Sequence, residues 1–449
     1  MENIIKTPCG MIKGVKVNDD IIAYKGIRYA KANRFEYPTL VTSWDGVYDG
    51  THYGNCSYQP RSFYNEEENF KKIFYYNEFR KNEKYEYSED CLFLNIFTKE
   101  NVKEDDNLPV IIYIHGGGFT GGCGHEKHFD CPSWPKYDVI GVTINYRLGP
   151  LGFACIEEQV DVEGKTGNFG LYDQIAAIKW VKNNIKAFGG NPDNITIMGQ
   201  SAGAMSVQQL CISPLTKGLF SKAVMSSGGG VSRLLPAQKA SKYFKLWDKV
   251  MELTNTHNLE ELKQVPVDEL FKAWNNARKL VKIMGMPVSI VIDEELVFKN
   301  SIRIVNTNNH HIIPYMIGSN SEDIIPPIIH KMAYKWSRRQ KQGYCWMFNH
   351  QLPGDDNGAW HSSDLWYWFG TLDNCWRPVS EDDYKLSNIM CRYLTNFAKN
   401  GNPNDNELPK WDLNERHRNI IHFNNEVKMN KVNKRKLWHN LFTKKAVGE

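Results

Sequence analysis

The sequence lacks any long hydrophobic run, any excess of charge of one sign, and any tract rich in glycine, serine or proline that would mark a linker. No apolar stretch approaches the roughly 18 residues that a membrane span needs. The 55 Lys and Arg residues stand against 51 Asp and Glu, a formal charge of +4 over 449 residues. That balance is too near neutrality for a nucleic-acid-binding surface. The sequence therefore predicts neither a membrane nor a nucleic-acid partner.

Cysteine is also scarce, with 10 residues and no C-x-x-C pair. This excludes a small disulfide scaffold and favours reduced thiols. The first residues lack the basic segment and apolar core of a secretory signal, so we expect a cytoplasmic protein. With 41% hydrophobic and 24% charged residues, the composition is that of a globular chain with a large core. No pattern indicates an oligomeric state.

What the sequence does contain is an alternation of strands and helices. Apolar, β-branched segments predict strands at residues 110–114, 139–145, 195–198, 222–226, 314–317 and 344–348. The clearest helix candidate covers residues 171–188, with Gly189 and Gly190 as a stop. This alternation predicts an α/β fold with a mostly parallel sheet between helical layers. Residues 57–87 are polar and are expected to form an excursion on the surface. Residues 236–310 are expected to form a mostly helical insertion.

A serine motif follows one of these strand candidates. Residues 199–203 read G-Q-S-A-G, a G-x-S-x-G sequence between the strand candidate 195–198 and a helix-forming run. In this layout the serine occupies a strained strand-to-helix turn, and small residues on either side let the backbone pass closely. Ser201 is therefore predicted as a nucleophile. The alternative interpretation is a glycine-rich turn in which Ser201 only caps the helix.

A second glycine-rich segment lies upstream, directly after the strand candidate 110–114. Residues 115–119 read H-G-G-G-F, and backbone N–H groups without side chains can point at a developing oxyanion. The N–H groups of Gly117, Gly118 and Ala202 are therefore predicted to form an oxyanion hole. A phosphate-binding role is not indicated, because neither common glycine-rich phosphate motif opens a helix here.

These motifs and several others occur in one order along the chain. The sequence resembles the type-B carboxylesterase and cholinesterase family over most of its length. The matching pieces are residues 24–30 (YKGIRYA), 88–95 (SEDCLFLN), 115–119 (HGGGF), 145–149 (NYRLG), 167–174 (GNFGLYDQ), 188–192 (FGGNP) and 199–203 (GQSAG). The resemblance implies the α/β-hydrolase fold, with residues 1–449 as a single domain, and hydrolysis of small-molecule carboxylic esters through an acyl-enzyme without a cofactor.

The resemblance also identifies the acid of a catalytic triad. Residues 318–323 read G-S-N-S-E-D, similar to a family segment that ends D-E-G and whose second acidic residue is the triad acid. This match selects Asp323, although Asp stands for Glu and Ile324 for Gly. Glu322 is the alternative acid.

Family spacing selects His361 as the base, in a loop after the strand candidate 344–348. His361 would take the proton of Ser201 and return it to the leaving alcohol. His350, at the strand end, is the rival, and His330 is expected to be structural. Only 38 residues separate Asp323 from His361, far fewer than in the cholinesterases, which implies a reduced cap region and a more open site.

The resemblance implies supporting contacts as well. Two buried ion pairs are expected, Arg34 with Glu89 and Arg147 with Asp173. Ser227 matches a family position whose side chain hydrogen-bonds the triad acid.

Two groups of cysteines match different patterns, one a disulfide and the other a metal-binding motif. Cys56 and Cys91 match a disulfide of secreted family members, but without a signal peptide we expect free thiols. A second set, C-x-H-x-x-H-x-x-C at residues 123–131, carries four residues of types that bind zinc, which would converge only if the loop curled around the ion. The family has no metal there, so none is predicted.

The leading hypothesis is a serine carboxylesterase that acts on small or aromatic esters. Cholinesterase activity is not expected, because choline recognition uses Trp and the stretch between Cys56 and Cys91 has none. A catalytically silent cholinesterase-like adhesion module is the rival from another class. A feruloyl-type esterase, a lactonase or an amidase fits the same residues. The aromatic run 366–369, with Phe119 and Phe153, is a candidate either for an apolar pocket or for core packing.

Overall fold

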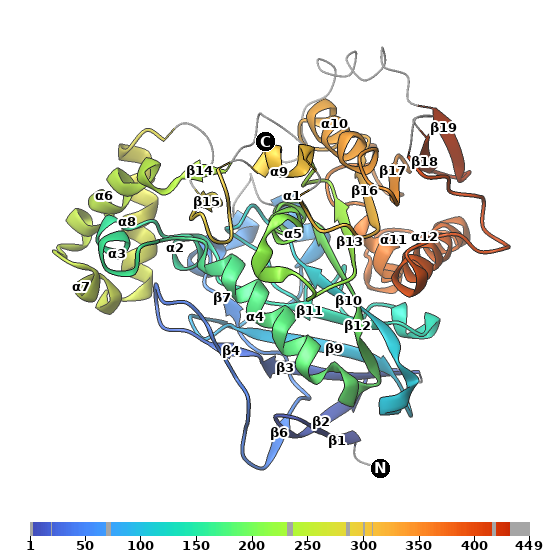
Figure 1. Ribbon diagram of the computed structural model, residues 1–449, viewed down its shortest axis with the longest axis horizontal. Coiled ribbons are helices and arrows are strands. Elements are labelled where there is room, and N and C mark those ends of the chain that lie inside the picture. The colour runs from blue at the N-terminus through green and yellow to red at the C-terminus, as the bar shows by residue number, and fades with distance from the viewer. Residues whose placement is uncertain are drawn as a thin grey trace.

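The computed structural model describes residues 3–18, 20–68, 73–230, 237–283, 288–299, 301–307, 309–414 and 419–431. Its main sheet has 13 strands in the order β1-β2-β3-β9-β11-β10-β12-β13-β16-β17-β18-β19, with β6 paired to β2 (Figure 1). The bounds are β1 (Asn3–Thr7), β2 (Gly10–Lys16), β3 (Ile21–Arg28), β6 (Val47–Asp49), β9 (Phe93–Lys99), β10 (Leu108–Ile114), β11 (Ile140–Ile144), β12 (Gly190–Gln200), β13 (Lys222–Ser226), β16 (Tyr315–Asn320), β17 (Gly343–Phe348), β18 (Asn419–Phe423) and β19 (Lys428–Lys431).

Neighbouring strands from β11 to β18 are all parallel. The six strands predicted from the sequence are confirmed as β10, β11, β12, β13, β16 and β17, and they make up most of this parallel part. The predicted helix is confirmed as α4 (Phe169–Asn184), followed by a 3-10 turn that ends at Gly189. The predicted α/β fold class is therefore correct.

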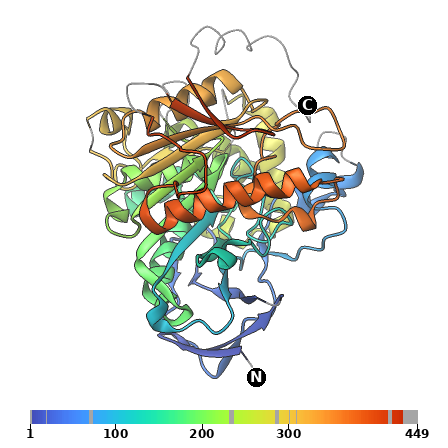
Figure 2. The same cartoon turned by 90° about the vertical axis from the view of Figure 1, so that its right-hand side faces the viewer.

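The sheet carries a hydrophobic core on each face. Successive residues of β10 point to opposite sides: Ile112 and Ile114 join one core cluster, whereas Ile111 and Tyr113 join the other. The first cluster includes residues of α4 and α5 (Ala202–Ile212), and the second those of α11 (Leu365–Phe369) and α12 (Glu381–Asn400). Figure 2 shows α12 lying across its face of the sheet. This two-sided burial explains why the parallel strands read as continuous apolar runs.

The two insertions predicted from the sequence add elements outside the main sheet, and both contribute buried residues to its core, such as Phe79 and Trp247. The region 57–87 contains α1 (Ile73–Phe79), and its base is formed by the short strands β7 (Cys56–Ser57) and β8 (Tyr87–Ser88). The second insertion holds α6 (Phe244–Thr254), α7 (Leu259–Gln264), α8 (Val267–Leu280), α9 (Ser301–Asn306), β14 (Gln238–Lys239) and β15 (Val291–Ile292). Helices α6 to α8 group at one end of the molecule, opposite α12 (Figure 1).

The remaining elements are short or lie between core strands: β4 (Ala30–Lys31), β5 (Thr39–Leu40), α2 (Gly149–Gly152), α3 (Glu157–Glu163) and α10 (Pro326–Ser337). The longest helix, α12, has 20 residues and many polar ones. Within the described ranges, no helix is both long and apolar enough to cross a membrane.

Both predicted ion pairs form, but only the Arg147–Asp173 pair is buried as expected, because the Glu89 side chain is 34% exposed. Arg147 donates from Nη2 to Asp173 Oδ1 at 2.7 Å and from Nε to Oδ2 at 2.9 Å, and both side chains are buried. Arg34 donates from Nε to Glu89 Oε2 at 2.8 Å. Loss of one partner of the buried Arg147–Asp173 pair would leave an uncompensated charge, so this pair holds the segment after β11 against α4. The Arg34–Glu89 pair joins the segment after β4 to the segment before β9.

Candidate active site

Ser201 lies at the sharp turn between β12 and α5. Its backbone has φ 55° and ψ −121°, a sparsely populated conformation that persists only where the surrounding structure enforces it. Two glycines allow the turn: a Cβ on Gly199 would lie 2.4 Å from the backbone of Gly203, and one on Gly203 would lie 2.0 Å from the carbonyl oxygen of Ile114. The crossing backbones therefore enforce the sharp turn that carries Ser201, and Ser201 is partly exposed.

The glycine-rich loop follows β10, the strand next to β12. Gly117 and Gly118 have positive φ angles of 100° and 63°, and their N–H groups donate to no acceptor within the described part of the chain. Ala202 is the first residue of α5, and N–H groups in the first helical turn have no partner inside their own helix. Unpaired donors at a helix start and in an adjacent loop are suited to an anionic oxygen.

Asp323 and His361 are in direct contact. His361 Nδ1 lies 2.5 Å from Asp323 Oδ1, and both side chains are buried. Asp323 follows the carboxyl end of β16, and His361 lies in the loop after β17. The structure thus brings together the acid and base candidates that were predicted 38 residues apart.

Hydrogen bonds and charge keep the Asp323 carboxyl ionised. Its Oδ1 accepts the N–H of Ile324 at 2.9 Å, and its Oδ2 accepts the N–H of Asn320 at 3.2 Å. Burial raises the pKa of Asp323, but attraction to His361 and hydrogen bonding outweigh it, and the net pKa is lowered. Ser227 also contributes to lowering this pKa, although no hydrogen bond of ordinary geometry joins its buried Oγ to a described residue.

Glu322, the alternative acid, has a different position. Its Oε2 accepts the N–H of Ala359 at 3.1 Å and the hydroxyl of Ser321, and its backbone N–H donates to the carbonyl of Ala359 at 3.1 Å. Glu322 therefore fastens the segment just before His361 to the end of β16, whereas Asp323 contacts the imidazole itself.

The other histidine candidates lie apart from this pair. His350 Nε2 contacts Asp383 Oδ1 at 2.8 Å, and its Nδ1 contacts Asn425 Oδ1 at 3.0 Å. His330 Nε2 contacts the carbonyl oxygen of Asn320 at 2.8 Å, and burial lowers its pKa. These contacts occupy both rings, so His361 is the remaining candidate for the base that acts on Ser201.

Gln200, the variable residue of the serine motif, contacts the base candidate His361, and the sequence reasoning did not identify this contact. Its Nε2 lies 3.2 Å from His361 Nε2 and donates to Ser362 Oγ at 2.9 Å. An amide nitrogen only donates and an ionised carboxylate only accepts, so the two contacts of His361 place its proton on Nδ1 and leave Nε2 as an acceptor. No hydrogen bond joins Ser201 to His361 in the described residues; the amide of Gln200 occupies that acceptor instead.

A buried network beneath His361 was also missed. Asp364 accepts hydrogen bonds from Ser226 Oγ at 2.7 Å, Asn320 Nδ2 at 3.1 Å and Trp368 Nε1 at 3.1 Å. Asn320 Nδ2 also donates to the carbonyl of Trp360 at 2.7 Å. Burial raises the pKa of Asp364. An acidic residue two positions before an aromatic run was the only signal in the sequence.

The aromatic residues near His361 are packing residues. The run 366–369 is at most 1% exposed and belongs to the core cluster around α11 and α12. Phe119 and Phe153 pack ring to ring in the other cluster, with centroids 4.9 Å apart.

The polar region 57–87 contacts the loop of His361, because Tyr75 donates its hydroxyl to the carbonyl of His361 at 3.5 Å. The excursion therefore covers the loop that carries the base.

Ser201, Asp323 and His361 all follow the carboxyl ends of parallel strands, the edge at which open α/β sheets carry their sites. A strained serine at this edge, next to an acid–histidine pair, is the arrangement of a hydrolase with the α/β-hydrolase fold.

Comparison with known proteins identifies the family. The model of the carboxylesterase family matches residues 1–328 and 325–439. The para-nitrobenzyl esterase of Bacillus subtilis is 30% identical over 91% of this chain and 92% of its own length, and the pyrethroid hydrolase Ces2a of Mus musculus is 27% identical over 91% and 86%. The solved structure of a thermophilic PNB esterase superposes with a TM-score of 0.84 at 26% identity, over 98% of this chain and 100% of the other. The chain belongs to the carboxylesterase family and is a carboxylic ester hydrolase.

Proposed function

We propose that the chain hydrolyses small or aromatic carboxylic esters through an acyl-enzyme formed on Ser201. His361 is the general base and acid, Asp323 orients His361, and the N–H groups of Gly117, Gly118 and Ala202 hold the oxyanion. The observation that carries the proposal is the 2.5 Å contact of His361 with Asp323. This contact lies at the sheet edge that also carries the sharp turn of Ser201.

The reaction begins when His361 Nε2 removes the proton of Ser201 as the hydroxyl attacks the ester carbonyl. For this step Ser201 Oγ has to replace the Gln200 amide at His361 Nε2. The tetrahedral intermediate then collapses, and His361 gives its proton to the leaving alcohol. Water then attacks the acyl group and loses a proton to His361. The bond to Ser201 Oγ breaks, and His361 returns the proton to Ser201 as the acid leaves. Throughout, the ionised Asp323 stabilises the imidazolium and does not itself take the proton.

Two observations support small or aromatic esters as the substrate class. The Bacillus relative is named for a para-nitrobenzyl ester. Between Asp323 and His361 the chain forms only α10 and β17, so this span supplies no further helices to roof the site. The reduced cap region and the open site remain part of the proposal.

The domain and compartment assignments belong to the same proposal. One sheet includes strands from β1 to β19, which supports treating residues 1–449 as a single α/β-hydrolase domain. All ten cysteines are free, including Cys56 and Cys91, which supports a reducing, cytoplasmic location.

Substitution of Ser201 tests the proposal against a silent adhesion module. Ser201→Ala should lower kcat for p-nitrophenyl acetate by about 10⁶-fold and abolish labelling by a fluorescent organophosphate. Wild-type protein that neither turns over esters nor takes the label would support the silent module, and labelling that survives in Ser201→Ala would remove Ser201 from the mechanism. A panel of aliphatic, benzyl and feruloyl esters, lactones and anilides then separates the esterase from its enzymatic alternatives.

A further inference from the structure

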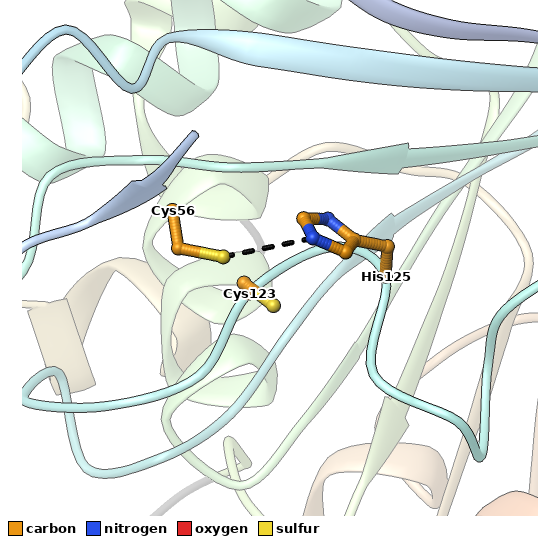
Figure 3. Close-up of side chains that lie close together, drawn as sticks. All are labelled: Cys56, Cys123 and His125. Carbon is orange, nitrogen blue, oxygen red and sulfur yellow. Dashed lines mark hydrogen bonds between the residues drawn. The ribbon is translucent and has the colours of Figure 1, made fainter. Parts of the chain in front are cut away.

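Cys56, Cys123 and His125 form a cluster, here called the Cys-Cys-His cluster, which the esterase mechanism does not use. Cys56 belongs to β7, whereas Cys123 and His125 lie in the loop that follows the glycines of residues 116–118. Figure 3 shows the His125 ring pointing a nitrogen at the Cys56 sulfur, with Cys123 beside them. The two sulfur atoms and a ring nitrogen all lie within 4.8 Å of one another.

These distances suit a tetrahedral metal ion. Zinc binds thiolate sulfur at about 2.3 Å and imidazole nitrogen at about 2.0–2.1 Å, so two ligand atoms on a tetrahedral ion lie roughly 3.6 Å apart. Cys56 Sγ and His125 Nε2 are 3.7 Å apart. An ion can therefore be held by small side-chain movements.

The polar atoms of the cluster are poorly paired as they stand. His125 Nδ1 is buried and has no hydrogen-bond partner among the described residues, and Nε2 meets only a thiol, which is a weak partner. A buried histidine usually has its ring nitrogens satisfied. The ring is nonetheless held in place, since it stacks on Tyr53 with centroids 4.4 Å apart and planes 3° apart.

The charges also favour a divalent ion bound by two thiolates. Such an ion with a neutral imidazole carries no net charge, which avoids the large cost of burying an unpaired charge. Two charged residues near the cluster, Arg61 and Glu126, form their own buried ion pair at 2.7 Å. Thiolate and imidazole ligands select zinc-like ions over Mg²⁺ and Ca²⁺.

The cluster differs from the C-x-H-x-x-H-x-x-C motif of the sequence. His128 stacks on Phe79, with ring centroids 3.7 Å apart, and Cys131 packs against the small core of Ile21, Ala23 and Phe97. His128 and Cys131 therefore do not belong to the cluster. Cys56, which lies 69 residues before His125 in the sequence, belongs to it instead.

We propose that Cys56, Cys123 and His125 bind one thiophilic divalent metal ion of the zinc type, with a fourth position open to water. The ion would tie β7 to the loop that carries Gly117 and Gly118. Gln59 already joins the same two segments, since its side chain accepts the N–H of Gly122 at 2.9 Å and donates to its carbonyl at 3.1 Å. The site is a structural clamp, and it stands independently of the esterase mechanism.

Cobalt substitution tests the proposal on the full chain. Reduced protein stripped with a chelator is titrated with Co²⁺ and then with Zn²⁺. We expect one equivalent of Co²⁺ with thiolate-to-cobalt charge-transfer absorption, which Zn²⁺ removes stoichiometrically, and a melting temperature that rises until one equivalent of Zn²⁺ is bound. This wild-type measurement does not depend on whether any variant folds.

Variants locate the ion. Cys123→Ser and His125→Gln should weaken Zn²⁺ binding by more than about 100-fold, because even residues outside the ligand set cost 10–100-fold. Cys131→Ser is the matched control and should bind Zn²⁺ as the wild type does. Absence of the cobalt absorption, equal affinity in His125→Gln, or a Cys56–Cys123 disulfide found by peptide mapping of protein prepared without oxidant would each overturn the proposal.

Discussion

Ser201 and His361 stand at the same edge of the sheet, but the chain holds them there by different means. Ser201 is fixed by backbone packed on backbone, where glycine 203 allows α5 to approach within van der Waals contact of the carbonyl of Ile114. His361 is fixed by side chains: Asp323 binds Nδ1, Gln200 approaches Nε2, and Glu322 holds the preceding segment.

The difference bears on how each half tolerates change. Where two backbones pass as closely as they do at Gly203, only glycine fits. A single added methyl group there would displace the whole turn. A side-chain network divides its task among several groups, and the loss of one contact costs about 1 kcal/mol unless that contact sets the protonation state of the base. Substitutions on the two sides should therefore differ in kind as well as in size.

The largest effect on the side-chain half is expected from Asp323→Asn. The amide no longer restricts the Nδ1 position to a donor, so His361 adopts the wrong tautomer and kcat falls by about 10⁴-fold. Steady-state turnover of p-nitrophenyl acetate measures this. Glu322→Gln is the matched control and should change kcat by less than about tenfold. The opposite order would make Glu322 the triad acid.

The backbone half is tested by Gly203→Ala. The new methyl group would lie 2.0 Å from Ile114 O, so the helix start has to shift, with a loss of about 1–3 kcal/mol in the free energy of unfolding. Displacement of Ser201 by about 1 Å should lower kcat about 10²-fold.

Gly218→Ala provides the comparison for that variant. Gly218 has φ 78° and no atoms near its added Cβ, so the substitution should cost about 1–2 kcal/mol in backbone strain and leave kcat unchanged. Urea unfolding with parallel kinetics distinguishes the two variants. If both lower kcat equally, crowding at the elbow is not what positions Ser201.

A smaller effect is expected from Glu322→Ala. This variant loses the acceptor of the Ala359 N–H at 3.1 Å, so the free energy of unfolding should fall by about 1 kcal/mol and kcat by less than about tenfold. Glu322→Gln keeps an acceptor oxygen and should restore most of both. Equal losses in the two variants would show that the charge of Glu322, and not its hydrogen bond, supports the loop.

The smallest change in plateau activity is expected from Gln200→Glu. A carboxylate placed 3.2 Å from His361 Nε2 stabilises the protonated imidazole, so a higher pH is needed to obtain the neutral base. The acid limb of the kcat/KM profile should move to higher pH by about one unit or more. Gln200→Ala, which adds no charge and only removes a donor to the neutral ring, should move the limb in the same direction by much less. An unmoved limb in Gln200→Glu would mean that this side chain does not face the base during turnover.

The comparison also explains what could be predicted from the sequence. Close backbone approach or a positive φ requires glycine at Gly199, Gly203 and Gly117. The turn at Ser201 and the glycine-rich loop after β10 can therefore be recognised in the sequence as motifs. The parallel strands were predicted because burial on both faces produces continuous apolar runs. The sequence therefore predicted the fold, and it also located the serine turn and the glycine-rich loop at the sheet edge.

The side-chain contacts left weaker signals. Residue spacing alone did not distinguish Asp323 from Glu322, because both are acidic and adjacent, and the direction of each carboxylate is set by the turn after β16. Gln200 was overlooked because its motif position accepts any residue. The sequence motif grouped Cys123 and His125 with His128 and Cys131, and no metal was predicted there. It did not indicate Cys56, since only the folded chain brings β7 next to residue 123.

The short span between Asp323 and His361 has a consequence for folding. Both residues belong to one strand–helix–strand unit, β16, α10 and β17, and closing their 38-residue loop costs roughly 1 kcal/mol less entropy than closing the roughly threefold longer loop back to Ser201. Local contacts of this kind form early. We therefore expect a refolding chain to acquire its acid–base pair before its nucleophile is in place, so that reactivity toward an organophosphate appears only in the last step.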